Sequence, residues 1–469
     1  MFFLTNSQSK TIFILILVAI ISGLFWSYRN LGNTLPLSTE GDAGFYNRLA
    51  VDILEGRSAV SYERETQRTA IEPLYPYFLA GIYSVFGKNY NTVIFAQLFF
   101  YCLVILVVYL IAKRVVEEKL AFLTAVLVAL FYPLVEWVGI LNREMLFIFF
   151  LIFFVYCLYK ARDTLKLQWF IFAGIACASA SLTNKIIQFI PLFIIFGFWA
   201  VFGKAIFQRR VIIKTTLFFV IAFILPTIFF LSNNLQRESF NATSSIFLSR
   251  KAQLMRDASG QYLDHFVGLT LGYYFSEKIN PNVRYKLFID DIKAADDFVK
   301  MRESGDTYQK IADEIFSREY NYLLVNPHKF LAATFLDFLQ FNGPMIVNPL
   351  TLAIGPMQNL FIKGTHPEIP PAGKVAILII LRLFYWTFFG FVIYGLVRAV
   401  KEWRKFIWIL LIILYFNLVY SAVFGLPRYA IPIYPFYILL FVMGATTAWN
   451  KYVGYNAKKC ESICEMCER

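Results

Sequence analysis

Ten long apolar runs constrain the fold of this chain more than any other feature of its sequence. They cover residues 11–27, 91–112, 120–138, 145–159, 167–184, 186–203, 215–232, 375–397, 406–426 and 429–449. A helix of about 20 apolar residues is long enough to cross the hydrocarbon core of a bilayer. Because lipid offers the backbone no hydrogen-bond partners, such runs must cross the membrane as helices. The sequence therefore predicts an all-α polytopic membrane protein, a bundle of about ten or more spans.

The composition agrees with this class of protein. Hydrophobic residues make up 58% of the chain and charged residues only 16%, which excludes a water-soluble globule. The formal net charge of +13 would suit nucleic acid. The bases flank the apolar runs, however, where they meet lipid head groups. We therefore expect membrane lipids, and no nucleic acid, among the partners.

Basic residues between the runs predict the orientation of the chain. The connecting segments rich in Lys and Arg are 113–119, 160–166, 204–214 and 398–405. By the positive-inside rule these segments are cytoplasmic. Both termini then lie in the cytoplasm, and the first loop, residues 29–90, faces outward.

Four regions follow from this topology. They are an N-terminal transmembrane module (1–232), an extracytoplasmic loop region (233–373), C-terminal transmembrane helices (374–450) and a cytoplasmic tail (451–469). The outer region contains a helical segment at 307–324, which Asn326-Pro327 should end. The short apolar stretch 329–341 is interpreted as an interfacial or re-entrant helix.

The first outer loop contains an acidic turn followed by the pattern of an amphipathic helix. Glu40 and Asp42 flank a glycine. The apolar residues that follow at helical spacing are Phe45, Tyr46, Leu49, Ala50 and Ile53. This pattern predicts a helix lying in the membrane interface that holds a carboxylate at the surface. Such a carboxylate suits a base that activates a hydroxyl group.

Charged residues also collect at the outer ends of other predicted elements. They are Arg68 and Glu72 in a second amphipathic segment of the first loop, Glu144 at the start of a span, Lys185 between two spans, and Arg428 with Tyr429 at the start of the last span. Lys and Arg there would suit a lipid phosphate. Taken singly, the acids could be helix caps and the bases could extend to head groups.

The centres of the spans are nearly free of charge, and Arg382 is the clear exception. An intramembrane base is a candidate for a functional site. Ion-coupled transporters usually place titratable groups near the middle of the membrane. The outer position of the acids therefore favours chemistry at the interface over passage through the bilayer.

Five short motifs occur in one order along the chain: Gly41–Ala50, Glu72–Ala80 with Phe86-Gly87, Asn142–Leu146, Leu182–Lys185 with Pro191, and Pro427–Tyr429 with Pro432 and Pro435. On these motifs the chain resembles the bacterial GT-C glycosyltransferases. The similar branch is the one related to dolichyl-phosphate-mannose protein mannosyltransferases and to the lipid A aminoarabinose transferase. The resemblance implies a GT-C-like helix bundle in a bacterial-type inner (plasma) membrane, with an extracytoplasmic active site.

The resemblance also implies a reaction. A monosaccharide would pass from a polyprenyl-phosphate-linked donor to a hydroxyl of a glycolipid, glycan or protein, by a single in-line displacement with inversion. Asp42 would be the general base and Glu144 a second acid. The bases near the sugar phosphate would be Lys185, Arg68 and Arg428.

Other predicted substrate-binding residues are Tyr46, Tyr429, Glu40 and Glu72. The aminoarabinose transferase has a Lys where Glu72 stands, so Glu72 could contact the sugar or a metal. Some GT-C enzymes use a divalent metal ion, and this sequence leaves that requirement, and the metal ligands, open.

Two other functions stay open. A transporter or flippase for a lipid-linked saccharide would also need a phosphate site and apolar walls. An oligosaccharide ligase or polymerase of another fold would also place polar loops on the outer side.

Overall fold

The computed structural model describes residues 6–28, 31, 41–57, 72–236, 242–271, 279–280, 308–343 and 371–467. Every regular element in these ranges is a helix, and none of the described residues forms a strand. The predicted all-α membrane fold is therefore confirmed.

Within the described ranges, eight helical segments are long and apolar enough to cross a membrane. Five are single helices: α1 (Asn6–Ser27), α5 (Tyr90–Val115), α8 (Glu144–Thr164), α20 (Pro371–Lys401) and α21 (Trp403–Val423). Three are composite. The first consists of η2 (Lys185–Ile187), α10 (Ile190–Phe202) and η3 (Gly203–Phe207), and the second of α11 (Arg209–Phe219), η4 (Val220–Ile224) and α12 (Leu225–Gln236). The third consists of η6 (Pro427–Ile433) and α22 (Tyr434–Cys467). The protein is an integral membrane protein.

In the part of the chain that the structure describes, two of the ten expected runs do not form a single long helix. The predicted run 120–138 is broken into α6 (Glu118–Leu130) and a segment formed by α7 (Tyr132–Val135) and η1 (Glu136–Val138), with a bend of 59°. Pro133 lies in the first turn of α7, where a proline is tolerated but cannot continue the preceding helix. Counting the bent pair as one span gives nine. The remaining run is α9 (Leu167–Thr183), which at 17 residues is shorter than the others.

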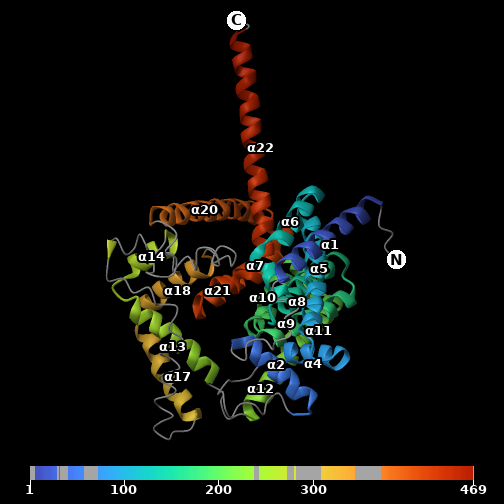
Figure 1. Cartoon of the computed structure of the whole chain (residues 1–469). Helices are drawn as coiled ribbons and strands as arrows, with labels where there is room; N and C mark the ends of the chain where they lie inside the picture. The colour runs from blue at the N-terminus through green and yellow to red at the C-terminus, as the bar shows by residue number, and fades with distance from the viewer. Residues whose placement is uncertain are drawn as a thin grey trace.

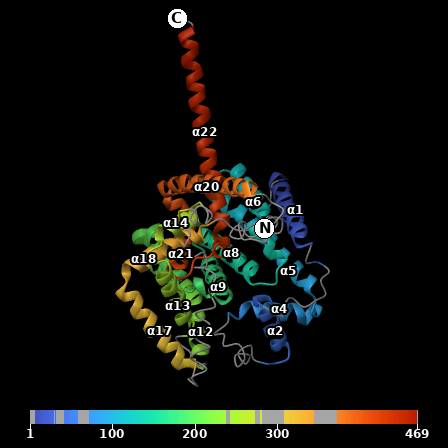
Figure 2. The same cartoon turned by 60° about the vertical axis from the view of Figure 1, so that its left-hand side comes forward.

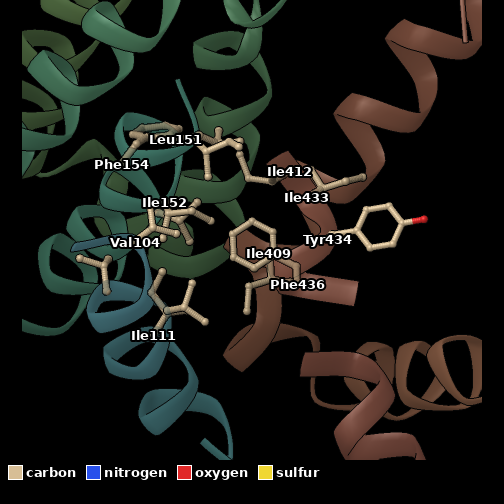
Figure 3. Packing of buried hydrophobic residues seen from close by; sticks show 14 of the residues in the cluster. Val104, Ile111, Leu151, Ile152, Phe154, Ile409, Ile412, Ile433, Tyr434 and Phe436 are labelled. Carbon is tan, nitrogen blue, oxygen red and sulfur yellow. The ribbon is translucent and has the colours of Figure 1, made fainter. Parts of the chain in front are cut away.

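One large apolar core joins the N-terminal and C-terminal spans. Figure 3 shows side chains of α5 and α8 facing those of α21 and the start of α22. The labelled residues are Val104, Ile111, Leu151, Ile152, Phe154, Ile409, Ile412, Ile433, Tyr434 and Phe436. Within a bilayer such contacts stabilise the bundle through close packing, since lipid is as apolar as the side chains.

Two glycines allow α20 to approach α22 closely. A Cβ on Gly395 would overlap the backbone oxygen of Leu440, and a Cβ on Gly444 would overlap that of Phe391. Small residues at such crossings let helix backbones meet. Figures 1 and 2 show α20 lying across α22, which projects beyond the bundle to the C-terminus.

The two predicted helices of the first loop are present as α2 (Gly41–Leu54) and α4 (Leu74–Phe86). They pack together in a second apolar cluster that also contains Val93, Leu141 and Leu146 of the bundle. The expected apolar face of α2 is the buried one, including Phe45 and Leu49. Figures 1 and 2 place α2 and α4 at the end of the bundle away from α6 and the C-terminus.

The base-rich ends of three spans meet at the opposite end. Arg114 of α5 pairs with Asp163 of α8. Arg162 of α8 donates to the Arg404 carbonyl over 3.1 Å, and Tyr159 donates to the Lys405 carbonyl over 3.0 Å. Because α8 runs from Glu144 to Thr164, the acidic and basic ends of the bundle are separated by a full span.

A second group of helices stands beside the bundle (Figure 1). It contains α13 (Ala242–Asp257), α14 (Tyr262–Thr270), α17 (Tyr308–Val325) and α18 (Pro327–Phe341). The predicted helix 307–324 and the break at Asn326-Pro327 are confirmed. Arg382 of α20 donates to the Leu269 carbonyl over 2.7 Å and to the Thr270 carbonyl over 3.4 Å. The intramembrane base therefore stabilises the C-terminal end of α14.

Candidate active site

The buried phenol of Tyr46 marks the point where the candidate site residues converge. It interacts electrostatically with Arg143, Glu72, Glu144 and Asp42. Burial raises its pKa well above the usual range, and the nearby Arg143 partly opposes that change. Tyr46 and Asp42 both belong to the first two turns of α2, so this helix brings a carboxylate to the start of α8.

Glu72 and Arg143 form the best-defined contact of the site. Arg143 Nη1 lies 2.7 Å from Glu72 Oε2, and the two side chains are only 23% and 16% exposed. The backbone N–H of Lys185 donates to Glu72 Oε1 over 3.3 Å. Burial alone would raise the pKa of Glu72, but Arg143, Lys185 and the backbone hydrogen bonds lower it overall. Glu72 is therefore held as a carboxylate between two cationic residues.

Glu144 begins α8 directly after Arg143. Its Oε2 is buried without a hydrogen-bond partner among the described residues. The carboxyl group interacts electrostatically with Arg143, Arg428 and Asp42. A buried polar atom without a partner is uncommon in folded proteins and indicates a place for a ligand or water.

Arg428 joins the site from the C-terminal half of the chain. The exposed side chain stands over the Tyr429 ring, 5.0 Å from its centroid, and Nη2 donates to the Tyr429 hydroxyl over 3.2 Å. Arg428 interacts electrostatically with Glu144 and Asp42. The start of η6 therefore faces the starts of α2 and α8.

Lys185 lies in the turn between α9 and α10. The Asn184 side chain accepts from the Ile186 N–H over 3.2 Å, and Tyr415 of α21 donates to the Ile186 carbonyl over 2.5 Å. The Lys185 Nζ stands 5.0 Å from the centroid of the Phe230 ring. These contacts hold the turn while the lysine stays beside Glu72.

Tyr420 of α21 forms an aromatic wall beside the charged groups. Its ring stacks on Tyr429 at 5.0 Å and on Phe341 of α18 at 5.3 Å. It also interacts electrostatically with Arg143 and Glu144. Sequence reasoning did not select Tyr420 or Arg143 as site residues. Arg143 stood inside the Asn142-Arg143-Glu144 motif, so its charge next to Glu144 was the available signal.

Seven of the nine predicted site residues belong to this cluster: Asp42, Tyr46, Glu72, Glu144, Lys185, Arg428 and Tyr429. Glu40 and Arg68 lie outside the described residues. Among the residues that the structure describes, no three His, Cys, Asp or Glu side chains are placed to hold a metal ion together.

The cluster combines two chemical capacities. Three cationic residues, Arg143, Lys185 and Arg428, lie near the acids of the cluster, and such cations could hold an anion such as a phosphate. Asp42 and Glu144 supply carboxylates within the same region, and a carboxylate can take a proton from a hydroxyl. The whole arrangement sits at one end of an apolar bundle, as a reaction on a lipid head group requires.

The archaeal oligosaccharyltransferase AglB from Archaeoglobus fulgidus, in complex with an inhibitory peptide and a dolichol-phosphate, is similar in structure, with a TM-score of 0.50 and 13% sequence identity. The similarity covers 97% of this chain and 52% of AglB. This chain thus spans about half the length of that protein.

A family model described as dolichyl-phosphate-mannose-protein mannosyltransferase matches residues 70–230, which include Glu72, Arg143, Glu144 and Lys185. The resemblance to the GT-C glycosyltransferases that the sequence predicted is confirmed.

Two further solved structures resemble this chain. The A. fulgidus oligosaccharyltransferase tethered to an acceptor peptide gives a TM-score of 0.48 at 16% identity, covering 95% of this chain and 50% of the other. ArnT from Cupriavidus metallidurans bound to undecaprenyl phosphate gives a TM-score of 0.39 at 13% identity, and the similarity covers 92% of this chain and 77% of ArnT. No curated protein matches the sequence of this chain.

Proposed function

We propose that this protein is a glycosyltransferase that moves a monosaccharide from a polyprenyl-phosphate donor to a hydroxyl of an acceptor at the outer face of the membrane. The observation that carries the proposal is the cluster of Arg143, Lys185 and Arg428 around Asp42 and Glu144 at one end of the bundle. Cations for a phosphate and a carboxylate for a proton are the two functions that such a transfer needs.

The donor class is supported by the position of the cations and by the fold. A polyprenyl chain would lie along the apolar spans, and its phosphate would meet Lys185, Arg143 and Arg428. The phosphate leaves as an anion, so it needs cationic stabilisation rather than protonation. AglB, which shares the fold, is described with a dolichol-phosphate, a lipid of this chemical class.

Asp42 is the proposed general base. The acceptor oxygen would form a bond to the anomeric carbon while the bond from that carbon to the phosphate oxygen breaks. The acceptor proton would pass to Asp42, and the configuration at carbon would invert. Glu144, with its partnerless buried oxygen, would hold a hydroxyl of the sugar or of the acceptor.

The outer position of the site is supported by the distribution of bases. Arg114, Arg162 and Lys405 gather at the end of the bundle opposite to Glu144. Under the positive-inside rule that end is cytoplasmic, and the site is then extracytoplasmic.

A flippase for a lipid-linked saccharide is the second candidate function, because it would need the same phosphate contacts. Its passage would require polar groups through the middle of the bundle. The large core between α8 and α21 consists of apolar side chains instead, and this favours transfer over translocation.

The test uses the purified full-length protein in detergent, with a membrane lipid extract that contains polyprenyl-phosphate sugars and native acceptors. Mass spectrometry follows the sugar-bearing lipid and the free polyprenyl phosphate. The proposal expects the sugar lipid to decrease and the free lipid phosphate to increase with time. Movement of the intact sugar lipid across liposomes, without its consumption, would establish the flippase instead.

A further inference from the structure

A buried ion pair lies outside the cluster described above and has no part in the proposed chemistry. Lys251 of α13 and Asp337 of α18 form an ion pair, and their side chains are 2% and 1% exposed. Burial raises the pKa of Asp337 to about 6, although Lys251 and the Gly425 N–H oppose that change. A pair this deeply buried is costly to desolvate, and apolar residues of similar size often give equal or greater stability. Its presence calls for a role other than stability.

The pair also binds the end of α21 and the turn that leads from it into η6. Lys251 Nζ donates to the Ser421 carbonyl over 2.8 Å, and the Gly425 N–H donates to Asp337 Oδ1 over 3.2 Å. A Cβ on Gly425 would overlap the backbone oxygen of Asp337. A hydrogen bond therefore fixes the last turn of α21 to α13, and a hydrogen bond with backbone contact fixes the turn at 424–426 to α18.

The same two helices contact this turn and its neighbours through aromatic rings. The Arg250 guanidinium of α13 stands 5.0 Å from the centroid of the Phe424 ring. Phe341 of α18 stacks on Tyr420, which in turn stacks on Tyr429. These contacts connect the second group of helices with the residues adjacent to Arg428.

We propose that Lys251 and Asp337 are positioning residues that hold the 424–426 turn so that Arg428 faces Asp42, Glu144 and the donor phosphate. The proposal rests on the proposed function, because it assigns Arg428 to a lipid phosphate. Lys251 and Asp337 themselves do not touch the substrate. They act through Ser421, Gly425 and the short stretch of chain that precedes Arg428.

The test measures the dissociation constant of undecaprenyl phosphate for the purified full-length protein and uses a double-mutant cycle. The first change is the charge-free pair Lys251→Met with Asp337→Leu, which removes the side-chain contacts to the end of α21 and to the turn without leaving a buried charge. The second change is Arg428→Gln. Each change alone is expected to weaken binding roughly tenfold, the worth of a charge-assisted hydrogen bond. The two changes combined should weaken lipid binding no more than Arg428→Gln alone, because each removes the same contact between Arg428 and the phosphate.

Glu319→Gln is the matched control. Glu319 is a fully buried acid of α17 that pairs with Arg256 of α13 and with Arg318. It belongs to the same group of helices, and among the described residues its side chain pairs only with Arg256 and Arg318, away from the turn. We expect this variant to bind the lipid as the wild type does, even where its thermal stability is lower.

Independent, multiplicative losses from the two changes would overturn the positioning role while leaving the proposed function intact. Absence of undecaprenyl phosphate binding by the wild type would instead contradict the proposed function. If the apolar pair does not fold, Lys251→Met alone replaces it in the cycle, because the Asp337 carboxyl can then take up a proton and lose its charge. The same comparison with Arg428→Gln decides the result.

Discussion

Arg143 and Glu72 connect the start of α8 with the segment that precedes α4, with 2.7 Å between Nη1 and Oε2. The contact ties the first loop to the transmembrane bundle. Since α4 packs on α2, it also fixes the helix that carries Asp42. The ion pair thus has two effects. It holds the geometry of the site, and it partly neutralises Arg143, a cation that could bind a phosphate.

Replacement of Glu72 by Gln should separate the effect of the ion pair on stability from its effect on phosphate binding. The variant is expected to lose about 1–3 kcal/mol of stability, since Arg143 loses a partly buried charged partner. Because the folded-state pKa of Glu72 is lowered, this stabilisation is present above its unfolded-state pKa and is lost as the pH falls through the folded value. Undecaprenyl phosphate should bind more tightly, because Arg143 and Lys185 are no longer neutralised.

Thermal unfolding in detergent and lipid titration measure both quantities. The control is Glu118→Gln, which removes an exposed acid paired with Lys113 at the opposite end of the bundle. Weaker lipid binding by Glu72→Gln than by the wild type would show that the carboxylate supports the anion site rather than competing for its cations.

His265 of α14 should make stability depend on pH. It is buried, and burial lowers its pKa to about 4, against the opposing effects of Asp264 and Asp257. The folded state thus favours neutral imidazole. Its contribution is complete above the unfolded-state pKa near 6.5 and is lost as the pH falls toward 4, amounting to about 3 kcal/mol. The unfolding midpoint of the wild type should fall over that interval, and His265→Gln should show a shallower slope. Equal slopes would contradict this assignment.

Lys185→Gln should weaken the binding of undecaprenyl phosphate. The lysine stands beside Glu72 in the anion-binding region, and loss of a charged partner to a phosphate is worth roughly 1.5–3 kcal/mol. Lys113→Gln is the matched control, because Lys113 lies at the base-rich end and pairs with Glu118 over 3.0 Å. Equal affinities for both variants would remove Lys185 from the phosphate site.

Gly395→Ala tests the close crossing of α20 and α22. Its Cβ would overlap the Leu440 backbone oxygen, and overpacking of this kind typically costs about 1–3 kcal/mol. Gly390→Ala is made in the same helix, where a Cβ would meet no atom within 4 Å. We expect Gly395→Ala to lower the unfolding midpoint in detergent, and Gly390→Ala to keep or raise it, since alanine is the better helix former. Similar midpoints would mean that the crossing is looser than described.

The positions of the apolar helices and the buried face of α2 could be predicted, because both follow from local sequence patterns. Apolar runs defined the spans, and the apolar residues around Phe45 and Leu49 defined the buried face of α2. Of the ten expected spans, the described residues give eight that meet the length and composition of a span, or nine with the bent pair, because the run through Pro133 bends and α9 is short. A hydropathy pattern records apolar length but not the bend that a proline introduces.

The pairing of distant charges could not be predicted. Glu72 pairs with Arg143 and accepts from the Lys185 backbone, and its expected contact with a sugar or metal stays a prediction. Arg382 had suggested a functional base, and the structure shows it bound to the carbonyls that end α14. Both outcomes depend on which helices meet in space, and a single sequence does not contain that information.

Asp42→Asn is the change that tests the central assignment. It keeps the size of the side chain while removing the base. Asp52→Asn is the control, because Asp52 lies on the same helix and pairs with Arg57 over 2.7 Å. Both variants should fold and bind undecaprenyl phosphate as the wild type does.

The decisive measurement is the rate of sugar transfer from the polyprenyl-phosphate donor by the purified Asp42→Asn protein. Loss of a general base predicts a rate lower by roughly 10²–10⁴-fold, with lipid binding retained and with Asp52→Asn close to the wild type. Transfer at the wild-type rate by Asp42→Asn would contradict the assignment of Asp42 as the catalytic base.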